Sequence, residues 1–141
     1  MKQVVLNIYS KMSNIGLRNI LFLNKIHTIE WMYEDNSGIY KRSNESDYLG
    51  QSVSKRIISH QNNIDVDSNN LEEAYLVFSE KIDIKGKELQ SDIAYQLTNE
   101  DGNELITKVP NSKVSVFFET EQETHLNFLI QSMFATTATR E

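Results

Sequence analysis

The first 25 residues carry apolar side chains at the spacing of an α-helix. Between residues 3 and 25 they recur every three to five positions, which is the period of a core-facing helix stripe. These positions are Val5, Ile8, Tyr9, Met12, Ile15, Ile20 and Leu23. Residues 20–23 are apolar on nearly every side, so this end should be buried. The pattern predicts an N-terminal helix over residues 3–25.

From residue 26 the period changes to two, which is typical of a half-buried β-strand. Ile29, Trp31 and Tyr33 occupy alternate positions, and the turn-forming residues 35–38 follow them. A hairpin with a returning strand at residues 39–42 is therefore expected. Because the predicted helix can cover the face that carries Trp31, we expect this side chain to be buried.

The rest of the chain contains further strand-like segments, each rich in β-branched or aromatic residues. They cover residues 52–60, 73–84, 92–97, 104–108 and 114–118. A loop is predicted at 61–70, which is rich in asparagine and aspartate, and a turn at 99–103. Together these elements predict an α+β fold, with the N-terminal helix packed on a mostly antiparallel β-sheet.

The segment from Leu126 to Phe134 fits two kinds of secondary structure. Its apolar residues at 126, 129, 130, 133 and 134 have helical spacing, whereas those at 126, 128 and 130 alternate as in a strand. Periodicity alone leaves both open.

The composition is that of one globular domain. With 141 residues and 39% hydrophobic residues, the chain can bury a core, and no repeat or linker divides residues 1–141. No uncharged apolar stretch approaches the roughly 20 residues that span a bilayer, and no signal peptide is recognisable. We therefore expect a cytoplasmic protein with no membrane partner.

The charge of the chain bears on its partners. There are 14 basic and 20 acidic residues, which give a net charge of -6. Nucleic-acid-binding proteins neutralise phosphates with clustered lysine and arginine, whereas the basic residues here are scattered apart from short pairs. The charge therefore argues against a DNA or RNA partner.

A metal site is one candidate for chemistry in the C-terminal third. Four ligand-type residues alternate there, namely Glu119, Glu121, Glu123 and His125. An extended backbone would place them on one face, where oxygen and imidazole ligands could hold a divalent metal. The alternative is a polar turn whose charges meet water. His27 and His60 have no acid nearby in the sequence and are expected on strand surfaces.

No complete motif for a cofactor or a catalytic centre is found. Residues 65–76 begin like a calcium loop, but Asn70 replaces the required glycine and Leu76 the required glutamate. The five glycines are too far apart for a phosphate-binding loop, and the lack of cysteine excludes thiolate chemistry. We expect the chain alone to be no enzyme and to bind no cofactor.

Three segments resemble, in the same order, blocks of bacterial relatives of sacsin and of the heat-shock-90-type chaperones. The most specific is residues 116–131, and residues 20–31 and 75–79 are similar to other blocks. The resemblance implies a fragment, the middle segment that follows the ATP-binding domain of a larger GHKL-type ATPase. It also favours a strand for residues 126–131. The D-x-G-x-G motif of the ATP-binding domain does not occur here.

The resemblance also implies a role for Arg140. Residues 136–141 match a family block, and in heat-shock-90-type chaperones an arginine in a similar setting reaches the γ-phosphate of ATP. A guanidinium can neutralise charge that develops during phosphoryl transfer. Arg140 would then be catalytic only within a full-length ATPase. The alternative is a solvated terminal charge.

The sequence favours two hypotheses of function over a third, a small metal-dependent enzyme that uses Glu119, Glu121, Glu123 and His125. The first is a non-catalytic middle segment of a sacsin-like ATPase, which couples ATP binding in a neighbouring domain to conformational change. The second is a stand-alone protein-interaction module, which binds another protein through a sheet edge or the surface around residues 126–134.

Overall fold

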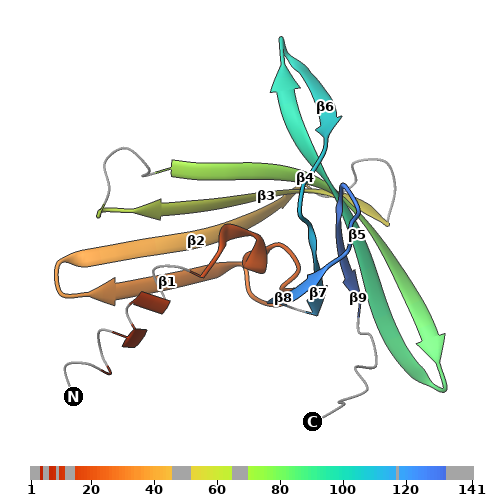
Figure 1. The fold of residues 1–141 in the computed structure, drawn as a ribbon, viewed down its shortest axis with the longest axis horizontal. Coiled ribbons are helices and arrows are strands. Elements are labelled where there is room, and N and C mark those ends of the chain that lie inside the picture. The colour runs from red at the N-terminus through yellow and green to blue at the C-terminus, as the bar shows by residue number, and fades with distance from the viewer. Residues whose placement is uncertain are drawn as a thin grey trace.

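The computed structural model of the chain is built on one large β-sheet (Figure 1). It describes residues 15–45, 52–64, 70–116 and 118–132, and also Val4, Asn7, Ile8, Ser10 and Lys11. Within this part the elements are η1, a 3₁₀-helix (Leu17–Ile20), β1 (Thr28–Tyr33), β2 (Asn36–Glu45), β3 (Val53–Asn62), β4 (Asn70–Ile84), β5 (Lys87–Glu100), β6 (Asn103–Thr107), β7 (Lys113–Val116), β8 (Phe118–Glu123) and β9 (Leu129–Ser132).

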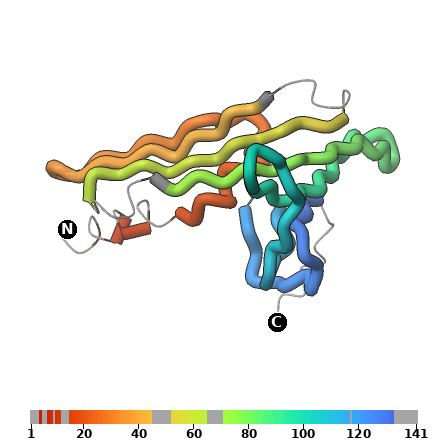
Figure 2. Tube along the Cα trace, turned by 90° about the horizontal axis from the view of Figure 1, so that it is seen from above, coloured from red at the N-terminus to blue at the C-terminus, as the bar shows by residue number. Residues whose placement is uncertain are grey.

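The strands follow the order β1-β2-β3-β4-β5-β9-β7-β8, and β6 pairs with β5 beside β9. All these pairs are antiparallel except β7 with β9, which is parallel. The first five strands form a meander joined by hairpins. The sheet curls, so that β7, β8 and β9 lie below the plane of the meander next to residues 15–23 (Figure 2).

The predicted α+β fold, with an N-terminal helix packed on the sheet, is wrong. Val4 and Ile8 have helical backbone, but their side chains are 62% and 57% exposed and do not face a core. Gly16 has a φ of 42°, a left-handed conformation that interrupts an α-helix. After it, the four-residue η1 is the only helix among the described residues. No helix among the described residues has the length and apolar character needed to cross a membrane.

The strand predictions are largely confirmed. The β1–β2 hairpin exists, but its turn is at residues 34–35, so residues 36–38 belong to β2. The five later segments coincide with β3, β4, β5, β6 and the region of β7, and the Asp101–Gly102 turn separates β5 from β6. Of the predicted loop 61–70, residues 65–69 lie outside the described part of the chain.

The ambiguous C-terminal segment contains a strand. β9 pairs with β5 and β7, and its central residues Ile130 and Gln131 face partners on both. Residues 126–128 form bends, so of the strand expected over residues 126–131 only the part from residue 129 exists, and the helical spacing is wrong there. Met133 and Phe134 lie outside the described residues.

The hydrophobic core lies between the meander and residues 15–23. The N-terminal segment contributes four consecutive buried residues, Ile20, Leu21, Phe22 and Leu23. They contact the inner face of the sheet, which is the face turned toward them. Its buried apolar residues are Trp31, Tyr40, Ile58, Tyr75, Val77, Ala94 and Leu129. Residues 20–23 are buried as predicted, but without the predicted helix.

Trp31 is 7% exposed, which confirms the prediction that it is buried. Trp31 and Gly38 are paired across the β1–β2 hairpin, and the indole lies over the glycine. A Cβ atom at position 38 would come within 2.4 Å of the Trp31 ring. The indole can therefore lie against β2 only because Gly38 has no side chain.

Gly38→Ala should consequently destabilise the protein. The added methyl must push the indole aside, and overpacking of this kind costs about 1–3 kcal/mol. The free energy of unfolding in urea, followed by tryptophan fluorescence, measures the loss. Ser37→Ala on the opposite strand face is the matched control and should change stability by less than about 0.5 kcal/mol. Equal stability of the two variants would contradict the packing described.

Candidate functional site

Two arginines on the inner face hold the N-terminal segment. Arg42 of β2 and Arg56 of β3 are only 5% and 7% exposed. The Nη1 groups of Arg42 and Arg56 donate to the carbonyl oxygen of Leu21, at 3.2 and 3.0 Å respectively. Because carbonyls at a helix C-terminus lack partners within the helix, these bonds satisfy a buried acceptor. The arginines thereby fasten residues 20–23 to the sheet.

Asp92 of β5 supplies the negative charge near both arginines. Its side chain is completely buried, and its Oδ1 accepts a hydrogen bond of 2.9 Å from Gln90 Nε2. The pKa of Arg42 is lowered to about 10, because burial and, to a smaller extent, the charge of Arg56 lower it more than Asp92 raises it. Burial also lowers the pKa of Arg56, again against the attraction of Asp92. Asp92 thus attracts both guanidinium groups and partly offsets the effect of their burial, without forming a direct ion pair with either of them.

The cluster continues into the C-terminal strands. Gln131 of β9 is paired in register with Asp92 on one side and with Ser115 of β7 on the other. Gln131 and Ser115 are 2% and 6% exposed. We call Arg42, Arg56, Asp92, Ser115 and Gln131 the buried polar cluster. It joins β2, β3, β5, β9 and β7 across the inner face.

Several polar atoms of this cluster have no hydrogen-bond partner within the described part of the chain. They are the donors Arg42 Nε and Arg56 Nε and the acceptors Asp92 Oδ2 and Gln131 Oε1. Since Asp92 has no exposed surface, it cannot reach a substrate in this conformation. The cluster is therefore suited to holding the N-terminal segment and the strands together. Because several of its buried atoms have no partner, a small movement of these side chains changes the stability of the cluster.

A second polar contact fastens η1 to β4. Arg18 Nε lies 3.2 Å from Glu73 Oε2 and 2.9 Å from the Tyr75 hydroxyl, which itself donates to Glu73. Burial raises the pKa of Tyr75, the Glu73 carboxylate raises it further, and Arg18 opposes the rise. The tyrosine therefore stays protonated and acts as a donor.

The four candidate metal ligands do not come together, and the alternative of a polar segment in contact with water describes them better. Glu119, Glu121 and Glu123 lie along β8 with their side chains exposed. Glu121 Oε2 is 3.5 Å from Lys113 Nζ, and His125 Nδ1 is 3.8 Å from Glu123 Oε2. Within the described residues, no three histidine, aspartate or glutamate side chains are placed to hold a metal ion. Arg140 lies outside the described residues.

His60 is not on the surface as predicted, because it is 7% exposed. Its ring stacks on Tyr40, with the ring centroids 3.9 Å apart and the planes inclined by 4°. Burial lowers the pKa of His60, so the neutral ring is favoured. His27, by contrast, is exposed, and its Nδ1 lies 3.3 Å from Arg42 Nη2.

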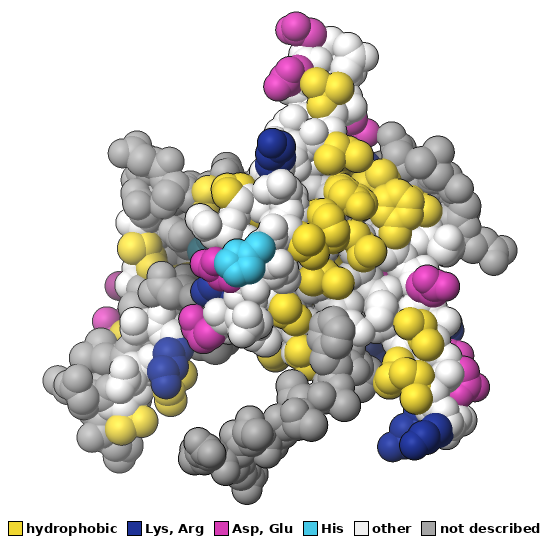
Figure 3. Space-filling view, turned by 45° about the vertical axis from the view of Figure 1, so that its right-hand side comes forward, with side chains coloured by type: hydrophobic (Ala, Val, Ile, Leu, Met, Phe, Trp, Pro, Cys, Tyr) yellow, Lys and Arg dark blue, Asp and Glu magenta, His cyan; other side chains and the backbone are white. Residues whose placement is uncertain are grey.

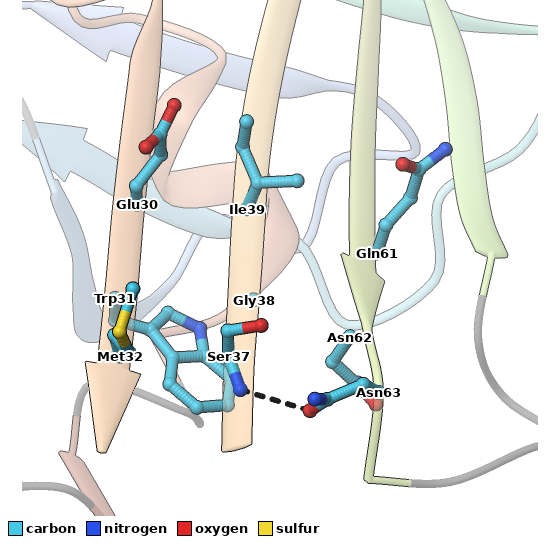
Figure 4. A pocket seen from close by; sticks show the side chains of 9 residues that line it. All are labelled: Glu30, Trp31, Met32, Ser37, Gly38, Ile39, Gln61, Asn62 and Asn63. Carbon is cyan, nitrogen blue, oxygen red and sulfur yellow. Dashed lines mark hydrogen bonds between the residues drawn. The ribbon is translucent and has the colours of Figure 1, made fainter. Parts of the chain in front are cut away.

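A pocket of about 500 Å³ opens at the end of the β1–β2 hairpin (Figure 4). Trp31, Gly38 and Asn63 contribute to its wall, and the Ser37 backbone N–H donates to Asn63 Oδ1 at 2.8 Å. The ionisable side chain in the lining is Glu30. One carboxylate without a basic or nucleophilic neighbour is not a catalytic arrangement.

Comparison with known proteins identifies no relative: no protein-family model, no curated protein and no solved structure matches the chain significantly.

Asp92→Asn should destabilise the fold, because it removes the negative charge that attracts two buried guanidinium groups. Since Asp92 forms no direct ion pair with either arginine, the expected cost is about 1–3 kcal/mol, that of a buried polar group that loses its electrostatic partner. The free energy of unfolding in urea measures this cost. Asp35→Asn, in the exposed β1–β2 turn, is the matched control and should cost less than about 0.5 kcal/mol.

A double-mutant cycle makes the test specific for charge. In the Arg56→Met background one buried positive charge is gone, so Asp92→Asn should cost at least about 1 kcal/mol less than in the parent chain. Additive costs would mean that Asp92 is not the counter-charge of the cluster.

Proposed function

We propose that the chain is a non-catalytic middle segment of a sacsin-like, GHKL-type ATPase and couples ATP binding in a neighbouring domain to conformational change. The observation that supports this role is the shared core of two distant sequence blocks. Residues 20–31 and 116–131 carry the family resemblance. Ile20 and Trp31 from the first and Leu129 from the second belong to one buried cluster.

The contacts between these blocks are suited to transmitting a movement of the N-terminal segment to the sheet. Residues 20–23 are bound by hydrogen bonds to Arg42 and Arg56, whose counter-charge Asp92 is paired in register with Gln131 of β9. A shift of the N-terminal segment would remove acceptors from two buried guanidinium groups, which is costly. The sheet is therefore expected to move with the segment, since packed cores resist continuous deformation.

The partners and the location follow from this role. The main partner is the ATP-binding domain of the same or another chain, and the setting is the cytoplasm. No cofactor is bound by this segment itself, and the net charge of -6 supports a role without nucleic acid. In this role Arg140 reaches the nucleotide of the neighbouring domain.

A stand-alone interaction module is the second candidate. It is favoured by the outer face of the sheet, which is the face opposite the buried polar cluster. Ile106 and Phe78 on this face are 60% and 40% exposed. The coding sequence around this chain helps to distinguish the two functions. An ATP-binding domain encoded in frame upstream supports the first, and a stand-alone gene with its own promoter and stop codon supports the second.

The isolated chain should not bind ATP, because it lacks the glycine-rich loop that wraps phosphates. Calorimetric titration with Mg-ATP should therefore give no binding heat at micromolar concentrations of nucleotide. Micromolar affinity would mean that the nucleotide site lies in this chain, and the proposed division between domains would fail.

In the enzyme that joins this chain to its ATP-binding domain, Arg140→Ala should lower ATP turnover by about 10²–10³-fold. Nucleotide affinity should change little, since the contact strengthens in the transition state. Arg140→Lys should restore little activity, because a point charge does not reproduce a planar fork of donors.

Lys108→Ala, which removes an exposed positive charge of β6's C-terminal flank, is the matched control and should leave turnover unchanged. If the Arg140→Ala enzyme hydrolyses ATP at the parental rate, Arg140 is a solvated charge without a catalytic role.

A further inference from the structure

One of the three histidines of the chain lies where a proton would be difficult to accommodate. His27 and His125 are exposed, whereas His60 is buried on the inner face of β3. Figure 3 shows that charged side chains project into solvent at the ends of the projecting hairpins. Because histidine changes its charge near neutral pH, a buried histidine makes the surrounding structure sensitive to acid.

The His60 ring is held by Tyr40. The two residues are paired in register between β2 and β3, and their stacked rings are in contact. His60 Nε2 is buried and has no hydrogen-bond partner within the described part of the chain. In the neutral ring this nitrogen can be the unprotonated one. In the charged ring both nitrogens carry a proton, so a buried N–H donor would be left without an acceptor.

Tyr40 connects the histidine to the N-terminal segment. The Ile15 backbone N–H donates a hydrogen bond to the Tyr40 hydroxyl. Ile15 and Leu17 are partly buried and pack against the hydrophobic core. η1 contacts β2 and β3, the two strands that carry Tyr40 and His60. A change in the ring stack is therefore felt where the N-terminal segment begins to pack on the sheet.

The ionisable side chains that face His60 come from β2, β3, β4 and η1. Within the described residues they are Tyr40, Arg42, Arg56, Glu73, Tyr75 and Arg18. Glu73 is the carboxylate among them, and it is already bound by Arg18 and by the Tyr75 hydroxyl. On the other side of Tyr40, β1 contributes the apolar Ile29. A proton on His60 would thus add positive charge to a face that already buries two arginines.

The direction of the pH dependence follows from this environment. Burial lowers the pKa of His60 below the ordinary value of 6.5. The contribution of the neutral ring to stability is therefore fully present above about pH 6.5. As the pH falls below this value, the unfolded chain takes up the proton before the folded chain does, so this contribution is lost.

We propose that His60 is an acid-sensitive latch for residues 15–17. At neutral pH the uncharged ring stacks on Tyr40 and keeps its hydroxyl in place for the Ile15 backbone. In mild acid the charged ring turns toward water, the stack opens, and residues 15–17 leave the core. Arg42 and Arg56 keep their charge in this range and go on holding residues 20–23, so the segment is released only at its beginning.

This latch is independent of the proposed coupling role. It uses the inner face of β2 and β3 and operates in the chain alone, without nucleotide. A chain that has no link to an ATPase can therefore still have the latch, and a coupling segment can lack it.

Amide hydrogen exchange of the full chain, corrected for the intrinsic exchange rate at each pH, tests the latch. Between about pH 7.5 and about pH 5, the protection of the Ile15 amide should fall at least about tenfold, because the buried ring loses its favourable state. In NMR spectra of the same chain, the ring signals of Tyr40 should shift together with the protonation of His60.

Two variants at position 60 separate charge from packing. His60→Phe keeps an aromatic ring for the stack but cannot take up a proton, so the protection of the Ile15 amide should be the same at both pH values. His60→Gln can neither stack nor become charged, so the protection should be low at both. His125→Phe removes an exposed histidine, is the matched control for His60→Phe, and should show the parental loss in acid.

A parental chain whose Ile15 amide keeps its protection at about pH 5 would overturn the proposal. So would a His60→Phe chain that loses as much protection as the parental chain. If His60→Phe does not fold, the NMR titration of the parental chain decides. Tyr40 ring signals that do not follow the protonation of His60 would show that the stack is not the latch.

Discussion

The structure depends on two buried guanidinium groups that share one backbone carbonyl. Residues 20–23 are apolar on every side, so water exclusion drives them under the sheet. Their short 3₁₀ turn leaves carbonyls without partners, and a buried carbonyl without a donor is costly. Arg42 and Arg56 supply those donors to Leu21, and Asp92 offsets their charge. The apolar segment can therefore replace a covering helix only because the sheet provides charged donors beneath it.

Local pattern was sufficient to predict most of the sheet, but it failed where tertiary context decides. Apolar residues at every second position correctly predict most of the strands and the burial of Trp31. The predicted N-terminal helix is wrong for two reasons. A segment that is buried on all sides can show the same spacing of apolar residues as a helix, so the spacing does not identify a helix. In addition, Gly16 has a positive φ, which interrupts an α-helix. For residues 129–132 the spacing of apolar residues fits a helix and a strand equally well. Pairing with β5 and β7 makes this segment a strand.

The buried polar cluster could not be predicted from spacing, because its members lie on strands far apart in the sequence and only the strand register joins them. One local signal was available. Arg42 lies two residues after Tyr40 and therefore on the same strand face, and Arg56 and His60 flank Ile58 in the same way. Charged residues on an apolar strand face indicate buried charge. Applied to β3, this rule also corrects the placement of His60.

If the arginines hold residues 20–23, this segment belongs to the same cooperative unit as the sheet, and native-state hydrogen exchange tests this most directly. The amides of Leu21 and Leu23, which donate to Arg18 and Ile20, should exchange with opening free energies within about 1 kcal/mol of those of β3 and β9. If these two amides exchange through local opening several kcal/mol below the sheet, the segment is not held by the arginines and the proposed coupling loses its basis.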